Sequence, residues 1–145
     1  MTYIKYAQDV LSGEIIAGEY IKLACERFFE LMESDEYEFR EHKVHEVIRF
    51  FNHLTHFTGK HSGKPFILEP WQEYIIASIY GFYIKEDGSR LVQKAYVEVS
   101  RKNGKSAIGA GIGLNGLLNA DADGAEVYFA ANLNDPVKQS AWPPC

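Results

Sequence analysis

The residues with the clearest chemical potential lie in one short stretch, residues 99–114, which reads VSRKNGKSAIGAGIGL. At its centre stand Gly104, Lys105 and Ser106. Glycine lets the backbone approach a phosphate without a Cβ in the way, lysine can reach the β- and γ-phosphates of a nucleotide, and a serine hydroxyl can coordinate Mg²⁺. Backbone N–H groups at the start of a helix add unpaired donors and positive potential. The tripeptide therefore predicts a phosphate site, provided that it stands between a strand and a helix.

The elements around the tripeptide meet that condition. Residues 94–100, KAYVEVS, alternate between apolar and polar side chains, which predicts a strand. Residues 106–118 are small and apolar and predict a buried helix, and residues 125–131, AEVYFAA, predict a second strand. A strand, a helix and a second strand in this order form one βαβ crossover of a parallel sheet. The sequence thus predicts the first βαβ unit of a P-loop NTPase.

Helices are predicted to occupy the first 85 residues. Apolar residues recur every three or four positions over residues 17–32 and 44–54. Pro70 is well placed to begin a third helix, because proline is tolerated in the first turn. Asp87 and Gly88 predict a tight turn.

The predicted fold class is therefore α/β. We expect a helical N-terminal lead-in over residues 1–62 and the start of a P-loop ATPase domain over residues 63–145. A single crossover is too little sheet to complete such a domain, so the sequence predicts an incomplete one.

Composition excludes several classes of protein. The 145 residues hold 15 basic and 20 acidic side chains and carry a net charge of −5, which does not fit a strongly basic nucleic-acid module. The two cysteines do not form a disulfide framework or a zinc knuckle. Two histidine pairs stand three residues apart, but no further ligands complete a metal site. No apolar run is long enough for a membrane span, and the N-terminus does not have the pattern of a signal peptide.

A second glycine pattern lies just downstream. Gly111, Gly113 and Gly116 spell GxGxxG, the fingerprint of dinucleotide-binding folds. In those folds the glycines directly follow the strand, whereas here they lie inside the predicted helix. We therefore interpret them as positions where the helix packs closely against a sheet.

Three segments together suggest a family. They are residues 63–82 (GKPFILEPWQEYIIASIYGF), 96–112 (YVEVSRKNGKSAIGAGI) and 125–132 (AEVYFAAN). In this order they resemble the N-terminal ATPase region of the large subunit of tailed-phage terminases, the motors that package DNA into capsids. The resemblance also accounts for Val99, which stands where most phosphate loops have their first glycine, because this family commonly replaces that glycine.

The resemblance implies roles for single residues. Gln72 would hydrogen-bond the adenine edge of ATP, with Trp71 packed beside it. Arg101 would sense or stabilise the γ-phosphate during catalysis, and Lys102 and Asn103 would shape the loop. Alternatives remain for three of these residues: an exposed helix position for Gln72, a core anchor for Trp71, and a solvated or ion-paired side chain for Arg101.

Hydrolysis needs parts that the sequence does not supply. No apolar strand ending in Asp-Glu follows Ser106, although such a strand would hold Mg²⁺ and orient the attacking water. The family's nuclease domain is also missing, and the tail LNDPVKQSAWPPC departs from the family. We therefore expect a truncated ATP-binding fragment that is inactive alone.

The resemblance implies ATP and Mg²⁺ as cofactors and the cytoplasm of a bacterial host as the location. Double-stranded DNA, the terminase small subunit and the capsid portal would be partners of the full-length parent. Two other interpretations stay open: a helical module that docks to packaging proteins beside an inert partial P-loop fold, and a fragment of another P-loop ATPase such as a helicase.

Overall fold

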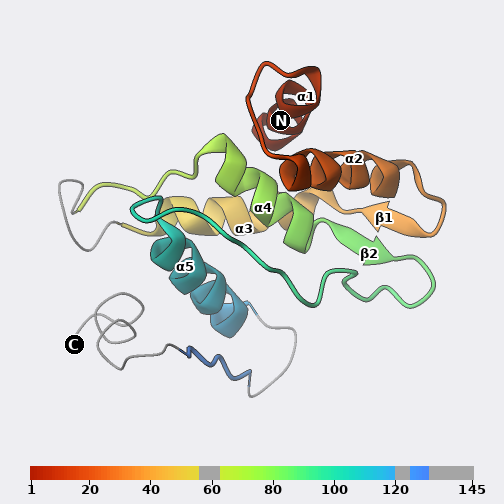
Figure 1. Ribbon diagram of the computed structural model, residues 1–145. Helices are drawn as coiled ribbons and strands as arrows, with labels where there is room; N and C mark the ends of the chain where they lie inside the picture. Colours follow the sequence, from red (N-terminus) through yellow and green to blue (C-terminus); the bar gives the residue numbers. More distant parts are fainter. Residues whose placement is uncertain (56–62, 120–124, 131–145) are drawn as a thin grey trace. The chain divides into compact units, whose positions relative to one another are not determined.

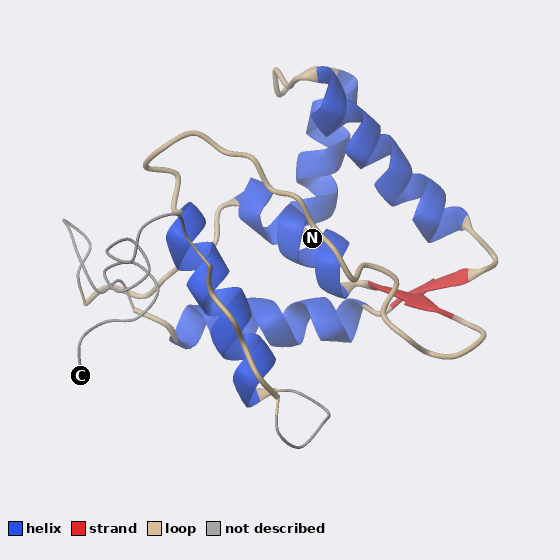
Figure 2. Cartoon of the chain, turned by 60° about the horizontal axis from the view of Figure 1, so that its bottom comes forward, coloured by secondary structure: helices blue, strands red, loops and turns tan. Residues whose placement is uncertain are grey.

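The computed structural model describes residues 1–55, 63–119 and 125–130 of the chain. Figure 1 shows the elements in chain order, and Figure 2 shows that helices dominate and that the strands are short. The helices are α1 (Thr2–Ser12), α2 (Glu19–Glu33), α3 (Glu41–His53), α4 (Pro70–Tyr80) and α5 (Lys105–Leu118). The strands are β1 (Tyr37–Phe39) and β2 (Phe82–Ile84). None of the described helices combines the length and the apolar composition needed to cross a membrane.

The chain forms two compact units that interleave along the sequence. The first consists of residues 1–49 and 67–96, and the second of residues 50–66 and 97–145. The helix α4 belongs to the first unit, whereas the loop ahead of α5 belongs to the second. The predicted division of the chain at residue 62 concerns function rather than packing, and it stays a prediction.

The first unit is built around a cluster of aromatic rings. Phe28 of α2 is 2% exposed and its ring centroid lies 5.1 Å from that of Phe82 and 5.6 Å from that of Phe39. The helix α1 adds Tyr3, Ala7 and Val10 to this core. Their spacing of four and three residues places them on one helix face. The sequence predicted a helical lead-in over residues 1–62 without specifying a helix at this segment.

A short antiparallel ladder closes one side of that core. Strand β1 pairs with β2 in a register that sets Phe39 opposite Phe82. After β2 the chain turns through the predicted Asp87-Gly88 site, where Asp87 accepts a hydrogen bond of 2.8 Å from the Ser89 N–H. Gly88 has a φ of 71°, which glycine adopts without a steric penalty. The turn prediction is confirmed, but neither strand was predicted.

The helix α4 begins at Pro70, as predicted, but buries a different face. The sequence places Trp71, Tyr74, Ile75, Ser78, Ile79 and Phe82 on one stripe at helical spacing. Of these, Ile75, Ser78 and Ile79 are only partly buried. The buried residues are Gln72, Tyr74, Ile76 and Ala77. Because the apolar side chains of α4 itself lie on nearly every side of the helix, periodicity alone does not identify the face that packs on the core.

The second unit contains α5, which begins one residue before its predicted start. Phe51, at the end of α3, packs where a Cβ on Gly111 would lie, and its ring centroid is 5.9 Å from that of Phe66. Val127 and Phe129 pack in the same way against Gly113. Close packing is therefore confirmed for Gly111 and Gly113. The predicted packing partner was a sheet, however, and the described residues that contact these two glycines belong to no strand.

The predicted parallel sheet is not present among the described residues. Residues 94–100 and 125–130 form no hydrogen-bonded strand with any described part of the chain, and residue 131 lies outside the description. Alternation of side chains shows only which residues would share a face, whereas a strand also needs a neighbour for its backbone groups. The fold that the structure supports is a mixed one, with helices and one small antiparallel sheet.

Candidate phosphate-binding site

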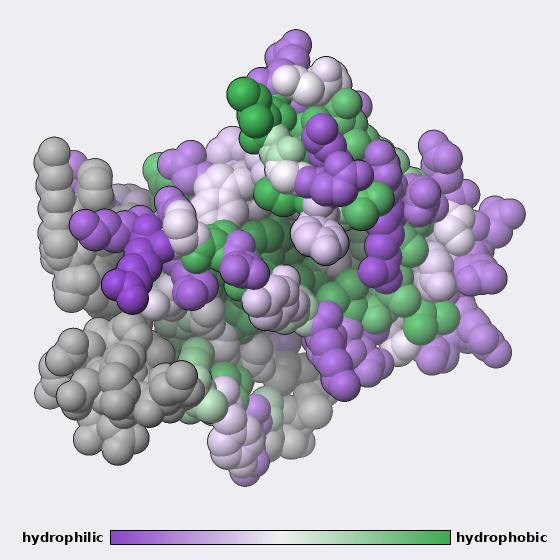
Figure 3. All heavy atoms as spheres, in the orientation of Figure 1, coloured by the Kyte–Doolittle hydropathy of each residue, from purple (hydrophilic) through white to green (hydrophobic). Residues whose placement is uncertain are grey.

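The predicted phosphate loop is an open turn that leads directly into α5. Every residue from 100 to 106 is exposed. The backbone is left-handed at Lys102, with a φ of 70°, and again at Gly104, with a φ of 73° and a ψ of 11°. Gly104 is the N-cap and α5 begins at Lys105. The predicted junction between loop and helix is therefore confirmed, although the segment before it is not a paired strand. Figure 3 shows hydrophilic side chains gathered over this loop.

The first turn of α5 presents its amide groups without a side-chain cap. Within the described residues no side chain accepts a hydrogen bond from the start of this helix. The first helical bond runs from the Ile108 N–H to the Gly104 carbonyl, at 2.9 Å. The amides of Lys105, Ser106 and Ala107 precede that bond and belong to the donors that a helix cannot satisfy internally. An anion in front of Gly104 would meet these donors and the positive end of the helix dipole.

The basic side chains of the loop are not used for internal structure. In the part of the chain that the structure describes, Arg101, Lys102 and Lys105 make no ion pair and no side-chain hydrogen bond. Of the alternatives for Arg101, the solvated side chain fits and an ion pair with another described residue does not. Three cations beside uncapped amides are an arrangement suited to a polyphosphate.

Asn103 connects two positions of this loop through side-chain hydrogen bonds. Its Nδ2 donates a hydrogen bond of 2.6 Å to the Ser100 Oγ and a longer one of 3.4 Å to the Ser100 carbonyl. Sequence reasoning had given Asn103 a loop-shaping role but had not singled out Ser100. A short polar residue three positions before an asparagine in a turn is a signal that could have found it.

Gln72, the predicted adenine-reading residue, has a structural task in α4. Its Oε1 accepts a hydrogen bond of 3.0 Å from the Glu69 N–H, and the Glu69 side chain accepts one from the Gln72 N–H in return. This capping box satisfies donors at the helix start. Gln72 is 6% exposed, so the alternative of an exposed helix position is wrong. Trp71 is partly buried, which fits either alternative, so its place beside the base stays a prediction.

Metal-binding clusters of histidine, cysteine, aspartate and glutamate do not occur among the described residues. His45 pairs with Glu41 at 3.2 Å on the surface of α3. His56, from the second histidine pair, and the tail from residue 131 onward lie outside the described residues, so the predictions about them remain predictions.

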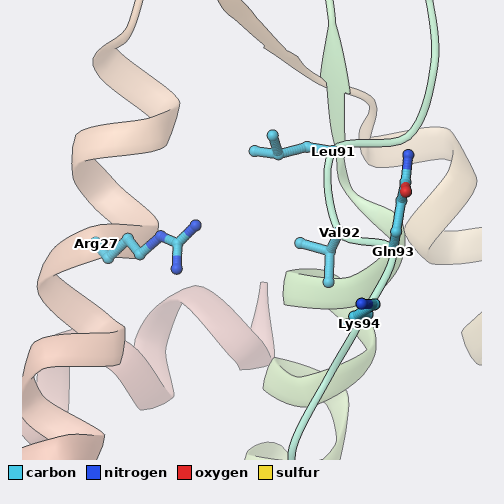
Figure 4. A pocket seen from close by; sticks show the side chains of 5 residues that line it. All are labelled: Arg27, Leu91, Val92, Gln93 and Lys94. Atoms are coloured by element: carbon cyan, nitrogen blue, oxygen red, sulfur yellow. The ribbon is translucent and has the colours of Figure 1, made fainter.

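A hollow of the first unit is lined by Arg27 of α2 and by residues 91–94 (Figure 4). Arg27 extends from α2 toward Leu91 and Val92 on the opposite side. The hollow contains two cations, Arg27 and Lys94, but none of the predicted site residues.

Residues 70–139 match the sequence model of the family described as terminase large subunit, ATPase domain. These residues belong to a terminase large-subunit ATPase domain. The match begins with α4, includes all the predicted site residues and continues into residues that the structure does not describe. No curated protein and no solved structure matches the chain. The terminase assignment favours the ATPase interpretation of the Gly-Lys-Ser tripeptide over the dinucleotide one, and terminase over helicase.

Proposed function

We propose that the chain binds ATP and Mg²⁺ as part of the motor with which a tailed phage packages DNA into its capsid. The observation that carries the proposal is the exposed loop of residues 100–106. It turns at a left-handed Gly104 into an uncapped helix start, within the segment that matches the terminase ATPase family. That combination supplies amides, positive charge and backbone access at one place.

In the proposed complex the loop amides and Lys105 hold the β- and γ-phosphates, while Arg101 stabilises charge on the γ-phosphate. Lys102 contributes further positive charge to the same loop. The Ser106 hydroxyl is the protein's ligand for Mg²⁺, which offsets phosphate charge when it is bound. Ser106 stands on the first turn of α5 and is exposed, so its hydroxyl is accessible from the solvent side of the loop.

We extend the proposal to the segments on either side of α5. In a terminase ATPase domain, residues 94–100 and 125–131 would be strands of a parallel sheet joined by α5. The exposed side chains of Tyr96 and Tyr128, which are 88% and 84% exposed, fit segments that pack against further chain in that domain. Double-stranded DNA, the small subunit and the portal are the proposed partners, and the host cytoplasm is the proposed location.

The phosphate site is tested by titrating the full chain with a fluorescent ATP analogue in the presence of Mg²⁺. Lys105→Ala should weaken binding about 10- to 100-fold, because it removes a charged hydrogen-bond donor to phosphate. Lys22→Ala is the matched control, since Lys22 is an exposed lysine of α2, and it should bind as tightly as the wild type. Equal affinity of Lys105→Ala and wild type would contradict the loop assignment. The isolated chain should show little or no ATP hydrolysis.

The adenine site is tested by comparing ATP with GTP. Gln72→Ala should reduce the preference for ATP, but it also removes half of the capping box, which is worth about 1 kcal/mol. Glu69→Ala is the matched control, because it removes the other half and leaves the Gln72 amide in place. Both variants should lose stability, and only Gln72→Ala should lose base preference. Unchanged preference in Gln72→Ala would exclude the adenine role.

A further inference from the structure

The loop ahead of α5 contains a side-chain contact that the Gly-Lys-Ser tripeptide does not require. The amide of Asn103 bonds both the hydroxyl and the carbonyl of Ser100, at 2.6 and 3.4 Å. The contact joins the two ends of a four-residue turn, so that Arg101 and Lys102 form its tip. Neither the tripeptide nor the resemblance to terminases assigned a role to Ser100.

The backbone inside this turn has an unusual shape. Lys102 is the one described residue other than glycine with a positive φ, at 70°, a conformation that side chains with a Cβ seldom adopt. Gly104 is left-handed as well, and Asn103 between them is not. Alternation of left-handed and other backbone conformations turns successive N–H groups toward the same side, which forms an anion-binding concavity. A conformation that is disfavoured at Lys102 persists only if surrounding contacts hold it.

We propose that Ser100 and Asn103 are positioning residues, whose mutual hydrogen bond holds the loop in its phosphate-binding shape before the ligand arrives. The inference rests on the proposed function of the loop and adds the contact that fixes the loop's conformation before the ligand binds. A loop already held in its bound shape loses less conformational entropy on binding, and this raises affinity without any contact to the ligand. The ligand class is a triphosphate chain, irrespective of the base.

The test uses the full chain and two probes, a fluorescent ATP analogue and inorganic tripolyphosphate as its competitor. Ser100→Ala and Asn103→Ala should each lower the affinity for both probes by about 3- to 10-fold, as expected for the loss of one hydrogen bond. The factor should be the same for both probes, because the effect concerns the phosphates alone. The double variant should bind no more weakly than the single variant with the lower affinity, because both substitutions break the same hydrogen bond.

Conservative and matched variants separate positioning from general damage. Ser100→Thr keeps the hydroxyl and should restore most of the affinity. Asn52→Ala, at an exposed asparagine of α3, should bind as the wild type does. Because Ser100 and Asn103 are both exposed, the thermal midpoint of the variants should stay within a degree or two of the wild type, by the rule that exposed positions contribute little to stability.

The outcomes distinguish this inference from the function on which it rests. If Lys105→Ala loses affinity while Ser100→Ala and Asn103→Ala bind like the wild type, the positioning role is wrong and the phosphate site stands. If the losses of the two single variants multiply in the double variant, they do not act through one bond and the inference fails. If the wild type binds neither probe, both proposals fall.

Discussion

The aromatic core of the first unit and the loop ahead of α5 are built in opposite ways. In the core, the ring of Phe28 lies within 5.8 Å of four other rings and is 2% exposed. In the loop, every residue from 100 to 106 is exposed, and its shape depends on backbone conformation and on the Asn103–Ser100 contact. Burial stabilises the first region, whereas the second leaves its polar groups accessible. Stability and phosphate binding should therefore respond to different substitutions.

The largest expected effect is on the core. Phe28→Ala should lower the free energy of unfolding by about 3 to 5 kcal/mol, because it removes a buried ring and leaves a cavity. The measurement is urea denaturation followed by circular dichroism. Tyr20→Ala removes a ring from the same helix at a position that is 88% exposed, and it should change stability by no more than about 0.5 kcal/mol. Equal losses in the two variants would show that α2 is not anchored through Phe28.

The two regions also differ in how far the sequence predicts them. Residues of α2, α3 and α5 repeat their apolar side chains at helical spacing, and the predicted helices lie there. The helix α1 repeats Tyr3, Ala7 and Val10 in the same way, but no helix was specified at this place within the predicted helical lead-in. Local spacing is enough for such helices because it depends on neighbours three or four residues away.

The strands could not be predicted in this way, because their pairing does not depend on residues three or four positions away. Strand β1 has three residues and pairs with β2 more than forty residues later, so no local sequence pattern predicts it. Residues 94–100 have a clear alternating pattern, yet they belong to no strand of the described sheet. Alternation reports which side chains share a face, whereas a sheet requires contacts that are distant in the sequence.

At the candidate site, the helix start was easier to predict than the shape of the loop before it. The Gly-Lys-Ser tripeptide located the helix start within one residue, because Gly104 and the run of small residues after it are local signals. The left-handed backbone at Lys102 and the hydrogen bond from Asn103 to Ser100 are conformational details that composition does not specify. The capping role of Gln72 could have been found, since Glu69 stands three residues before it and Pro70 begins the helix.

The next prediction tests whether packing also fixes α5, behind the open loop. Gly111→Ala should destabilise the chain by about 1 to 3 kcal/mol, because the new Cβ would occupy the place of the Phe51 ring. Gly109→Ala on the same helix meets no atom within 4 Å and should stabilise the chain by up to about 1 kcal/mol, since alanine favours helix. The sign of each change is read from urea denaturation. Stabilisation by both substitutions would mean that α5 does not pack on Phe51.

The smallest effect concerns the phenol of Tyr3, in the core. Burial raises the pKa of Tyr3 to about 12, and the charges of Glu41 and Glu73 add to the shift. In the unfolded chain a tyrosine titrates near pH 10. Between these values the folded chain keeps a proton that the unfolded chain has lost, so folding stability falls as the pH rises from about 10 to about 12. Tyr3→Phe should make this decline less steep, as measured by urea midpoints at several pH values.

The slope should flatten only in part, because burial also raises the pKa values of Tyr6 and Tyr74 in the same core. Tyr20→Phe is the matched control: its phenol is 88% exposed, so folding removes little of its contact with water, and the variant should keep the wild-type slope. A wild-type slope in Tyr3→Phe as well would mean that Tyr3 ionises as readily in the folded chain as in the unfolded one. The core would then admit solvent at α1, and its contrast with the exposed loop would be weaker than the structure indicates.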